Sequence, residues 1–499
     1  MAKTIIDLPS ELVELIATRL NDEDVLALRR TSRPLERGSF SHFGKRFFRK
    51  KGYLLTSPSL AVLQGVADHS QLRKYVQHVW FNPDCFTFIR PECAPDPEET
   101  PDPENPDGLV DLLSPNDRRM YQAYEECMKD HYRLIAHTAS ELQSVLTKAF
   151  AKLPNLKIIG MRRSEDHRPW GWRTLRDAVG EDPRVLGPIP SGPLYMLSTP
   201  ARLFLALLSA VADSGVVLRR FYTDAIELDN IRPDLLSQEL LNEACSSIWY
   251  LEVNVMRSLL NTKRNANYIT PGHPKWVDGD GLLRLLRGCH SLKEIGLQIF
   301  PDRQATHRLA ALNATDRFAE TWQFKCFDNV MLKVDMPGLD RIKLEKLVTT
   351  PYHLLAFLRP SATCLTSLKL RDVRLIGGED ASPWQSIFQF LHDECPRLDS
   401  ILLHHLLYTY GGVSFAENIE SAALAAEDGT ETEGGNGEAW NDRSSHFTDY
   451  EKITLQISGA ENVRRSLGDV VEGHWYQKPL FTYEMDDMLW HTDTSDEEW

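Results

Sequence analysis

One short apolar pattern recurs along this chain and limits what it can fold into. Six segments carry leucine-like residues in the spacing Leu-x-x-Ile-x-Leu, namely 153–161, 245–253, 289–297, 336–344, 362–370 and 395–403. The last two positions of each triplet are two residues apart and share one face of a strand, whereas the first lies at the bend that leads into it. Such self-similarity is typical of repeat proteins, whose units bury their apolar faces against their neighbours.

Amphipathic helical patterns precede the copies. Leucines at 282, 283, 285 and 286 run into Cys289, and similar apolar pairs at 354–358 and 387–391 lead towards Leu365 and Cys395. The order helix, turn, strand resembles leucine-rich repeats, particularly those with cysteine at the helix-to-strand junction. The resemblance implies an α/β fold, an irregular leucine-rich-repeat solenoid with a curved parallel sheet and outer helices. Clear copies are about 26 to 47 residues apart, longer than the usual 20 to 29, so insertions and larger helices are expected.

Three weaker copies extend the array. They contain Val76, Val79 and Phe81, then Leu218 and Phe221, and lastly Tyr450, Ile453 and Leu455. We expect 91–108, rich in proline and acids, and 417–446, rich in glycine and acids, to be mobile insertions, because neither can bury enough apolar surface to order itself.

Residues 5–40 predict three short helices in succession. Pro9 suits a first helical position, and Leu12, Ile16 and Leu20 recur with helical spacing to form one apolar stripe. Asn21 or Asp22 can cap a second helix, and Thr31 or Ser32 a third that opens with Pro34. A unit of this size is close to the limit for independent folding, so it needs a partner or the rest of the chain.

The Leu8-Pro9-x-Glu11-Leu12 opening, Ile16, Leu20, Asp24 and the Leu26/Leu28 pair resemble an F-box. This resemblance implies docking on a Skp-type adaptor of a cullin-RING (SCF-type) ubiquitin ligase. The third helix departs from the family because it lacks the aromatic residue that many members carry. The candidate adaptor-binding residues are Leu8, Pro9, Leu12, Ile16, Leu20 and Leu26.

An F-box followed by irregular leucine-rich repeats is similar to the fungal F-box/LRR-type proteins. The resemblance implies a substrate-recognition subunit, in which the repeat arc holds an unknown target protein. The predicted organisation is an F-box-like domain at 1–50, the repeat-like domain at 51–482, and an acidic tail at 483–499. The alternative is a non-ligase interaction scaffold whose F-box-like helices cap the solenoid. Exposure of Leu12, Ile16 and Leu20 favours docking, whereas their burial against 60–81 favours a cap.

The net charge and the apolar segments limit the kinds of binding partner and the cellular compartment that the sequence allows. A net charge of −15 argues against nucleic acid or an anionic membrane as the main partner. The longest apolar run, Leu203 to Ala212, is about half of what a membrane span needs and predicts a buried helix. No secretory signal pattern is present, and eight cysteines without CxxC spacing indicate reduced thiols. We therefore expect a cytoplasmic or nuclear protein.

The sequence predicts no enzyme activity, no cofactor and no metal. It contains none of the zinc-protease, paired CxxC, phosphate-loop or nucleophile-elbow motifs. Cys289 and Cys395 occupy the repeat position of Leu153 and Met336, so they are predicted to be packing residues. His404 and His405 are adjacent on a strand and point to opposite faces, so one metal could hardly use both. An enzyme of unrecognised type is a third, remote alternative.

Arginines near the strand ends suggest a weaker hypothesis. If they converged from different repeats, they could form a basic pocket that reads phosphate on a target protein. The candidates are Arg162, Arg163, Arg219, Arg220, Arg371 and Arg374.

Overall fold

The structure, a computed structural model, describes residues 5–83, 114–135, 140–162, 169–179, 199–224, 226, 228, 231, 234–256, 279–300, 326–376, 383–408, 411–415, 454–472 and 475–479. The chain divides into two compact units, Met1–Trp249 with Gly288–Ser291, and Tyr250–Arg287 with Leu292–Trp499. The division falls inside the predicted repeat domain, 51–482. The predicted insertions 91–108 and 417–446 and the tail 483–499 lie outside the described residues.

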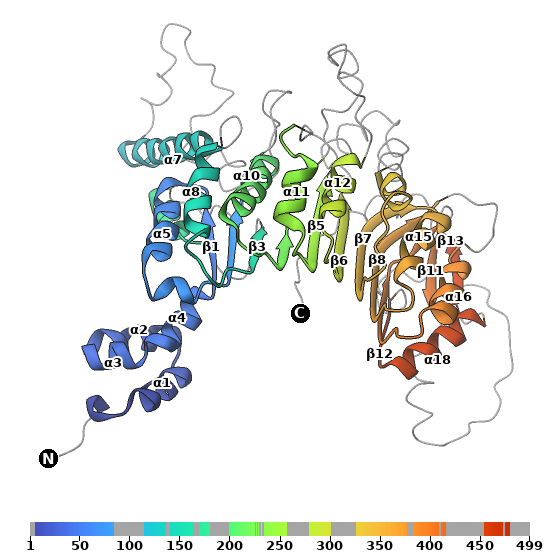
Figure 1. Ribbon diagram of the computed structural model, residues 1–499, viewed down its shortest axis with the longest axis horizontal. Helices are drawn as coiled ribbons and strands as arrows, with labels where there is room; N and C mark the ends of the chain where they lie inside the picture. Colours follow the sequence, from blue (N-terminus) through green and yellow to red (C-terminus); the bar gives the residue numbers. More distant parts are fainter. Residues whose placement is uncertain are drawn as a thin grey trace, which may run out of the picture. The chain divides into compact units, whose positions relative to one another are not determined.

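The first unit begins with helices and continues as alternating helices and strands (Figure 1). Its strands are β1 (Lys50–Leu54), β2 (His78–Asn82), β3 (Ile158–Met161) and β4 (Arg220–Tyr222), and neighbours pair in parallel in that order. Its helices are η1 (Ile5–Asp7), α1 (Ser10–Arg19), α2 (Asp22–Thr31), α3 (Arg33–Gly38), α4 (Phe40–Phe48), α5 (Ser57–Asp68), η2 (Leu72–Lys74), α7 (Pro115–Leu134), α8 (Ser140–Phe150), α9 (Trp172–Val179), α10 (Thr199–Ser214) and α11 (Gln238–Cys245).

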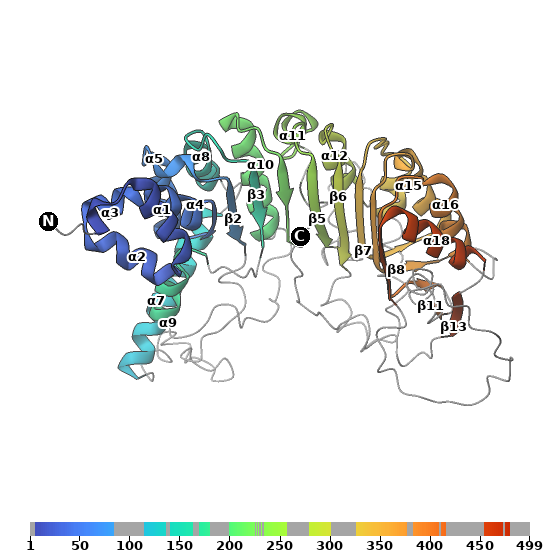
Figure 2. The same cartoon turned by 90° about the horizontal axis from the view of Figure 1, so that it is seen from below.

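The second unit continues the same alternation. Strands β5 (Tyr250–Met256), β6 (Glu294–Phe300), β7 (Arg341–Thr349), β8 (Ser367–Leu375) and β9 (Ser400–His404) are parallel neighbours. Its helices are α12 (Asp280–Gly288), α15 (Pro351–Leu358), η6 (Arg359–Ser361), α16 (Gln385–Glu394) and α18 (Ala460–Val471). Figure 2 shows the helices that precede strands lying along one face of each unit's strands.

All six predicted pattern copies end in a strand, which confirms the parallel repeat arrangement. They lead into β3, β5, β6, β7, β8 and β9 in turn. Every triplet residue is buried: Leu156, Ile159, Met161; Ile248, Leu251, Val253; Leu292, Ile295, Leu297; Leu339, Ile342, Leu344; Leu365, Leu368, Leu370; Leu398, Ile401, Leu403. The two weaker copies at 76–81 and 218–221 lead into β2 and β4. The mixed α/β, largely parallel arrangement is consistent with the leucine-rich-repeat interpretation.

The predicted parallel sheet gives way to antiparallel pairing in its last strands. Strand β12 (Thr454–Ser458) runs antiparallel to β9, and β11 (Gly411–Phe415) runs antiparallel to β10 (Leu407–Tyr408) and to β13 (Trp475–Pro479). Only residues 409 and 410 separate β10 from β11, which is too short for the crossover that parallel strands require. The last predicted copy is therefore not a repeat, because its Leu455 lies in an antiparallel strand.

The junction cysteines are packing residues, as their repeat position predicts. Cys245, Cys289 and Cys395 are buried where each helix meets its strand. A hydrogen bond with the Cys245 thiol, together with burial, raises the pKa of Cys289. Burial raises the pKa of Cys395 to about 12, so its thiol is protonated and unreactive at neutral pH.

The long apolar run forms the buried helix that the sequence predicts. In α10 twelve consecutive residues, Pro200 to Val211, are buried, and Phe204 packs on Phe221 of β4 with ring centroids 5.8 Å apart. Among the described residues, no helix combines the length and the apolar character needed to cross a membrane.

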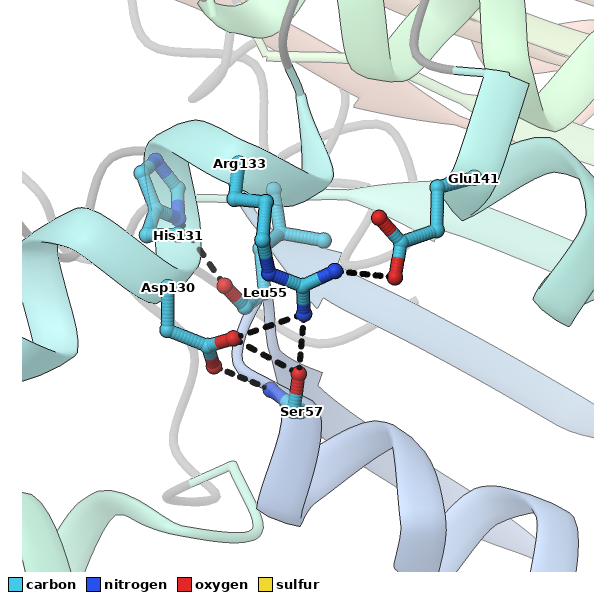
Figure 3. Close-up of polar contacts among 6 residues, drawn as sticks. All are labelled: Leu55, Ser57, Asp130, His131, Arg133 and Glu141. Atoms are coloured by element: carbon cyan, nitrogen blue, oxygen red, sulfur yellow. Dashed lines mark hydrogen bonds and ion pairs between the residues drawn. The ribbon is translucent and has the colours of Figure 1, made fainter.

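A polar cluster joins α7 to the start of α5 (Figure 3). The Asp130 carboxylate accepts hydrogen bonds from the backbone N–H of Ser57 (2.6 Å) and from its hydroxyl (2.7 Å). Ser57 is the first residue of α5, whose own N-cap residue, Thr56, makes no side-chain cap bond. Arg133 donates to Asp130 and Ser57 and pairs with Glu141 of α8. Asp130 thus caps α5 from another helix, where the helix dipole favours a negative charge.

Removing this cap should destabilise the first unit. We expect Asp130→Ala to lower the free energy of unfolding by about 2 kcal/mol, because it leaves the α5 N-terminus without its acceptor and removes one of the acceptors of Arg133. Lys129→Ala is the matched control, since Lys129 is mostly exposed and makes only an i,i+4 ion pair with Glu125. Urea unfolding followed by circular dichroism measures both. Equal stability of the two variants would contradict the capping role.

His131 should make stability depend on pH. Its ring is fully buried, its Nδ1 lies 3.0 Å from the Leu55 carbonyl oxygen, and burial lowers its pKa to about 4. In the unfolded chain this histidine binds a proton near pH 6.5, whereas in the folded chain it stays neutral down to about pH 4. The free energy of unfolding therefore falls by up to about 3 kcal/mol as the pH is lowered from about 6.5 to about 4. The difference in unfolding free energy between pH 7.5 and pH 5.5 should be smaller in His131→Gln than in wild type; an unchanged difference would show that His131 does not contribute.

Candidate protein-docking surface

Three helices form at the predicted places in residues 5–40. Pro9 directly precedes α1, one position earlier than predicted. The Asn21 side chain accepts a hydrogen bond from the Asp24 N–H (2.8 Å) and caps α2. Ser32 accepts one from the Leu35 N–H (3.4 Å) and caps α3, which has Pro34 in its first turn.

A fourth helix, α4, completes a small helical core. Helix α1 packs on α3 and α4, and α2 packs on α3. The core side chains are Val13, Ala17, Val25, Leu35 and Phe48. At Gly38, an added Cβ would lie 3.0 Å from the Val13 side chain, which is tighter than most Cβ contacts, so the small residue favours this close packing of α1 on α3.

Cationic side chains hold these helices together. The Arg29 guanidinium lies over the Phe43 ring at 3.9 Å and donates to the Glu36 carbonyl at 3.0 Å. Arg46 of α4 donates to the Leu20 carbonyl at 2.7 Å and pairs with Asp22 at 2.5 Å. These bonds tie the end of α1 and the start of α2 to α4.

Helix α4 is also the connection to the repeats. Phe40 packs edge-on against Tyr75, with centroids 6.2 Å apart, and Gly44 lies directly on the Tyr75 ring, where an added Cβ would be 2.4 Å away. In Figure 1 the helices α1 to α3 lie beyond α4 at the N-terminal end of the first unit. The helical core therefore contacts the repeats through α4, which leaves the outer side of α1 available.

That outer side of α1 and the turn before it carry a cluster of exposed apolar side chains. Ile5, Ile6, Leu12 and Leu15 are 45%, 48%, 46% and 56% exposed. They are four of the nine exposed large apolar residues in the described part of the chain, and the other five are scattered through it. Scattered residues of this kind are ordinary, whereas a cluster indicates an interaction site.

Five of the six predicted adaptor-binding residues lie in α1 or directly beside its ends, and the sixth lies in α2. Leu12 and Pro9 are exposed, and Leu8, Ile16, Leu20 and Leu26 are partly buried. Leu12 and Ile16 share one face of α1, whereas Leu26 belongs to α2. None of the six is fully buried. The cap alternative, in contrast, predicts burial of Leu12, Ile16 and Leu20.

The sequence interpretation missed Ile5, Ile6 and Leu15. Leu15 lies three residues after Leu12 and on the same face, so the (i, i+3) spacing could have identified it. We define the α1 patch as Leu12, Leu15 and Ile16, with Ile5, Ile6 and Leu8 leading into it.

The polar clusters of the described residues have structural explanations. Ser57, Asp130 and His131 are the residue types of a hydrolase triad, but Ser57 donates to Asp130, and the His131 ring contacts the Leu55 carbonyl instead. His404 and His405 contact Thr454 and Asp372 respectively, each at 2.7 Å. No group of three or more histidine, cysteine or acidic residues in the described part of the chain is arranged to hold a metal ion.

The arginines of the phosphate hypothesis lie in both units. In the first unit, Arg162 stacks on Tyr222 at 4.8 Å, and Arg220 lies near Trp249 at 5.8 Å. Both are close to His78, whose pKa falls to about 3 through burial and through the nearby charges of Lys50, Arg220 and Arg162. Arg371 and Arg374 are on β8 of the second unit, and Arg163 lies outside the described residues.

Comparison with known proteins identifies no family. No protein-family model matches the chain, and no curated protein matches it. Among solved structures, the leucine-rich repeat-containing protein LegL7 from Legionella pneumophila is similar over 72% of this chain and 91% of its own, with 10% sequence identity and a TM-score of 0.26.

Proposed function

We propose that this protein is the substrate-recognition subunit of a cullin-RING ubiquitin ligase. In this proposal the α1 patch docks on a Skp-type adaptor and the repeat units bind the protein to be ubiquitinated. The protein would recruit the ligase chemistry and carry out no catalytic step itself. Such a role belongs to the cytoplasm or the nucleus, where the buried thiols of Cys245, Cys289 and Cys395 would stay reduced.

The observation that carries the proposal is the unused apolar surface of α1. The helix already buries Val13 and Ala17 inside the helical core, yet it also presents Leu12 and Leu15 outward. Each leucine leaves about half of its side chain in solvent, and full burial of a leucine is worth roughly 1.5–3 kcal/mol, so covering the exposed half at an interface would add about 1 kcal/mol per residue. A partner that covers them gains that free energy, and the F-box resemblance of residues 5–40 supplies the kind of partner.

The competing function is a non-ligase interaction scaffold in which the N-terminal helices cap the repeats. One observation favours a capping contribution: α4 packs directly on Tyr75 through Phe40 and Gly44. A cap would bury its apolar residues against the repeats, however, and the capping role does not explain why Leu12 and Leu15 are exposed.

Truncating the α1 patch should weaken adaptor binding without unfolding the protein. We expect Leu12→Ala/Leu15→Ala to lose about 2 kcal/mol or more of binding to a purified Skp-type adaptor, roughly a thirtyfold weaker Kd. Calorimetric titration of the full chain measures this, and circular dichroism checks the fold. Both side chains are about half exposed, so folding should be little affected.

A matched control removes equally exposed apolar groups elsewhere. Val217→Ala/Leu332→Ala deletes side chains that are 63% and 54% exposed and distant in sequence from α1. This variant should bind the adaptor like wild type. Absence of binding by the wild-type chain, or equal weakening in both double variants, would overturn the ligase proposal and leave the scaffold function.

A further inference from the structure

The sheet face opposite the helices in the second unit is rich in positive charge on two neighbouring strands. Buried residues of β7 and β8 alternate with half-buried or exposed ones, so the polar side chains gather on the face that the helices do not cover. This face of β7 and β8 carries six basic residues and two acids: Arg341, Lys343, Lys346, Lys369, Arg371 and Arg374, with Glu345 and Asp372. We call it the β7–β8 face.

A stacked bulge increases the density of charge there. Lys346, Asp372 and His405 have φ values of 52°, 53° and 50°, a left-handed conformation that costs a non-glycine residue about 1–2 kcal/mol. Glu345 pairs with Arg371 and Leu347 with Val373, so Lys346 and Asp372 occupy matching positions. This irregularity, here called the stacked bulge, interrupts the alternation of buried and exposed residues in both strands without adding a residue to either. Each bulge places two consecutive polar side chains on the same face instead of one.

The cations on this face reach outward, and the acids lie lower. The side chains of Arg341, Arg371 and Lys343 are 53%, 42% and 32% exposed. The acids are only 16–19% exposed, both on this face (Glu345 and Asp372) and on the neighbouring strands β5 and β6 (Glu252 and Glu294). The ion pairs between them are long, from Lys343–Glu345 at 3.3 Å to Lys343–Glu252 and Arg371–Asp372 at 3.7 Å. A ligand approaching this face therefore meets positive charge first.

One cross-strand pair brings two cations together on this face. Lys343 of β7 lies directly opposite Lys369 of β8 in the parallel register. Like charges in such a position repel each other. Glu345 and Glu252 offset part of this repulsion through their ion pairs with Lys343, and an anion bound above the two lysines would offset more. This arrangement lies in a chain with a net charge of −15, so the local positive charge is contrary to the overall balance.

We infer that the β7–β8 face binds an extended, acidic segment of a partner protein. Nucleic acid fits less well, because the acids between the cations and the negative charge of the whole chain repel a continuous polyanion. A peptide offers separated carboxylates that can pair with Arg341 and Arg371. The inference deepens the proposed function, and it rests on that function only in identifying the partner as the target protein.

Binding of a labelled peptide tests the inference. The probe is a fluorescein-labelled peptide of about eight residues that alternates glutamate and serine, long enough to lie along one strand. Arg341→Gln/Arg371→Gln in the full chain should weaken its binding roughly tenfold, measured by fluorescence anisotropy at low salt. Lys333→Gln/Arg465→Gln, which removes two exposed cations outside this face, should leave binding unchanged.

Further variants separate a charge effect from a folding effect. Arg341→Lys/Arg371→Lys keeps both charges and should bind within about threefold of wild type. A peptide with glutamine in place of glutamate should not bind. Equal affinity in the glutamine and control variants, or equally strong binding of single-stranded DNA, would overturn the inference. The measurement uses no adaptor, so its failure would leave adaptor docking untouched, and the reverse also holds.

Discussion

The structure depends on one repeated constraint: each apolar triplet can be buried only between its own helix and the strands on either side. The backbone follows the same rule. The N–H groups of Thr366 and Ser367 donate to the Asp340 carbonyl, and those of Asp399 and Ser400 donate to the Thr366 carbonyl. Each repeat therefore uses its predecessor both for packing and for hydrogen bonds at the strand start. A single repeat has no stable fold, and stability is shared along each unit.

This constraint explains which parts of the fold were predictable. The triplets are local and periodic, so the sequence locates β3 and β5 to β9 before any coordinates are known. The pattern does not reveal where the array ends. Strand β9 carries the same apolar triplet as the strands before it, yet it pairs with the antiparallel strand β12. The stacked bulge was also hidden, since Lys346, Asp372 and His405 adopt left-handed conformations without glycine to mark them.

The docking surface was only partly predictable for a related reason. Helix α1 is apolar on two sides, with Val13 and Ala17 on one and Leu12, Leu15 and Ile16 on the other. Helical periodicity identifies both stripes but cannot say which of them faces the core. The tertiary contacts of α1 with α3 and α4 decide this. One of them is the close approach of Gly38 to Val13, two residues that the sequence pattern treats as unrelated.

The two proposed surfaces suit different kinds of binding. The α1 patch is apolar, so its affinity would come from buried area and appear mainly as slow dissociation. The β7–β8 face presents half-exposed charges above acids, so it would contribute more to the rate and selectivity of encounter than to affinity, and salt would weaken it. A receptor that holds its adaptor durably while it samples targets quickly needs this difference. The character of the two surfaces thus fits the proposed division, in which α1 docks on an adaptor and the repeats bind a target.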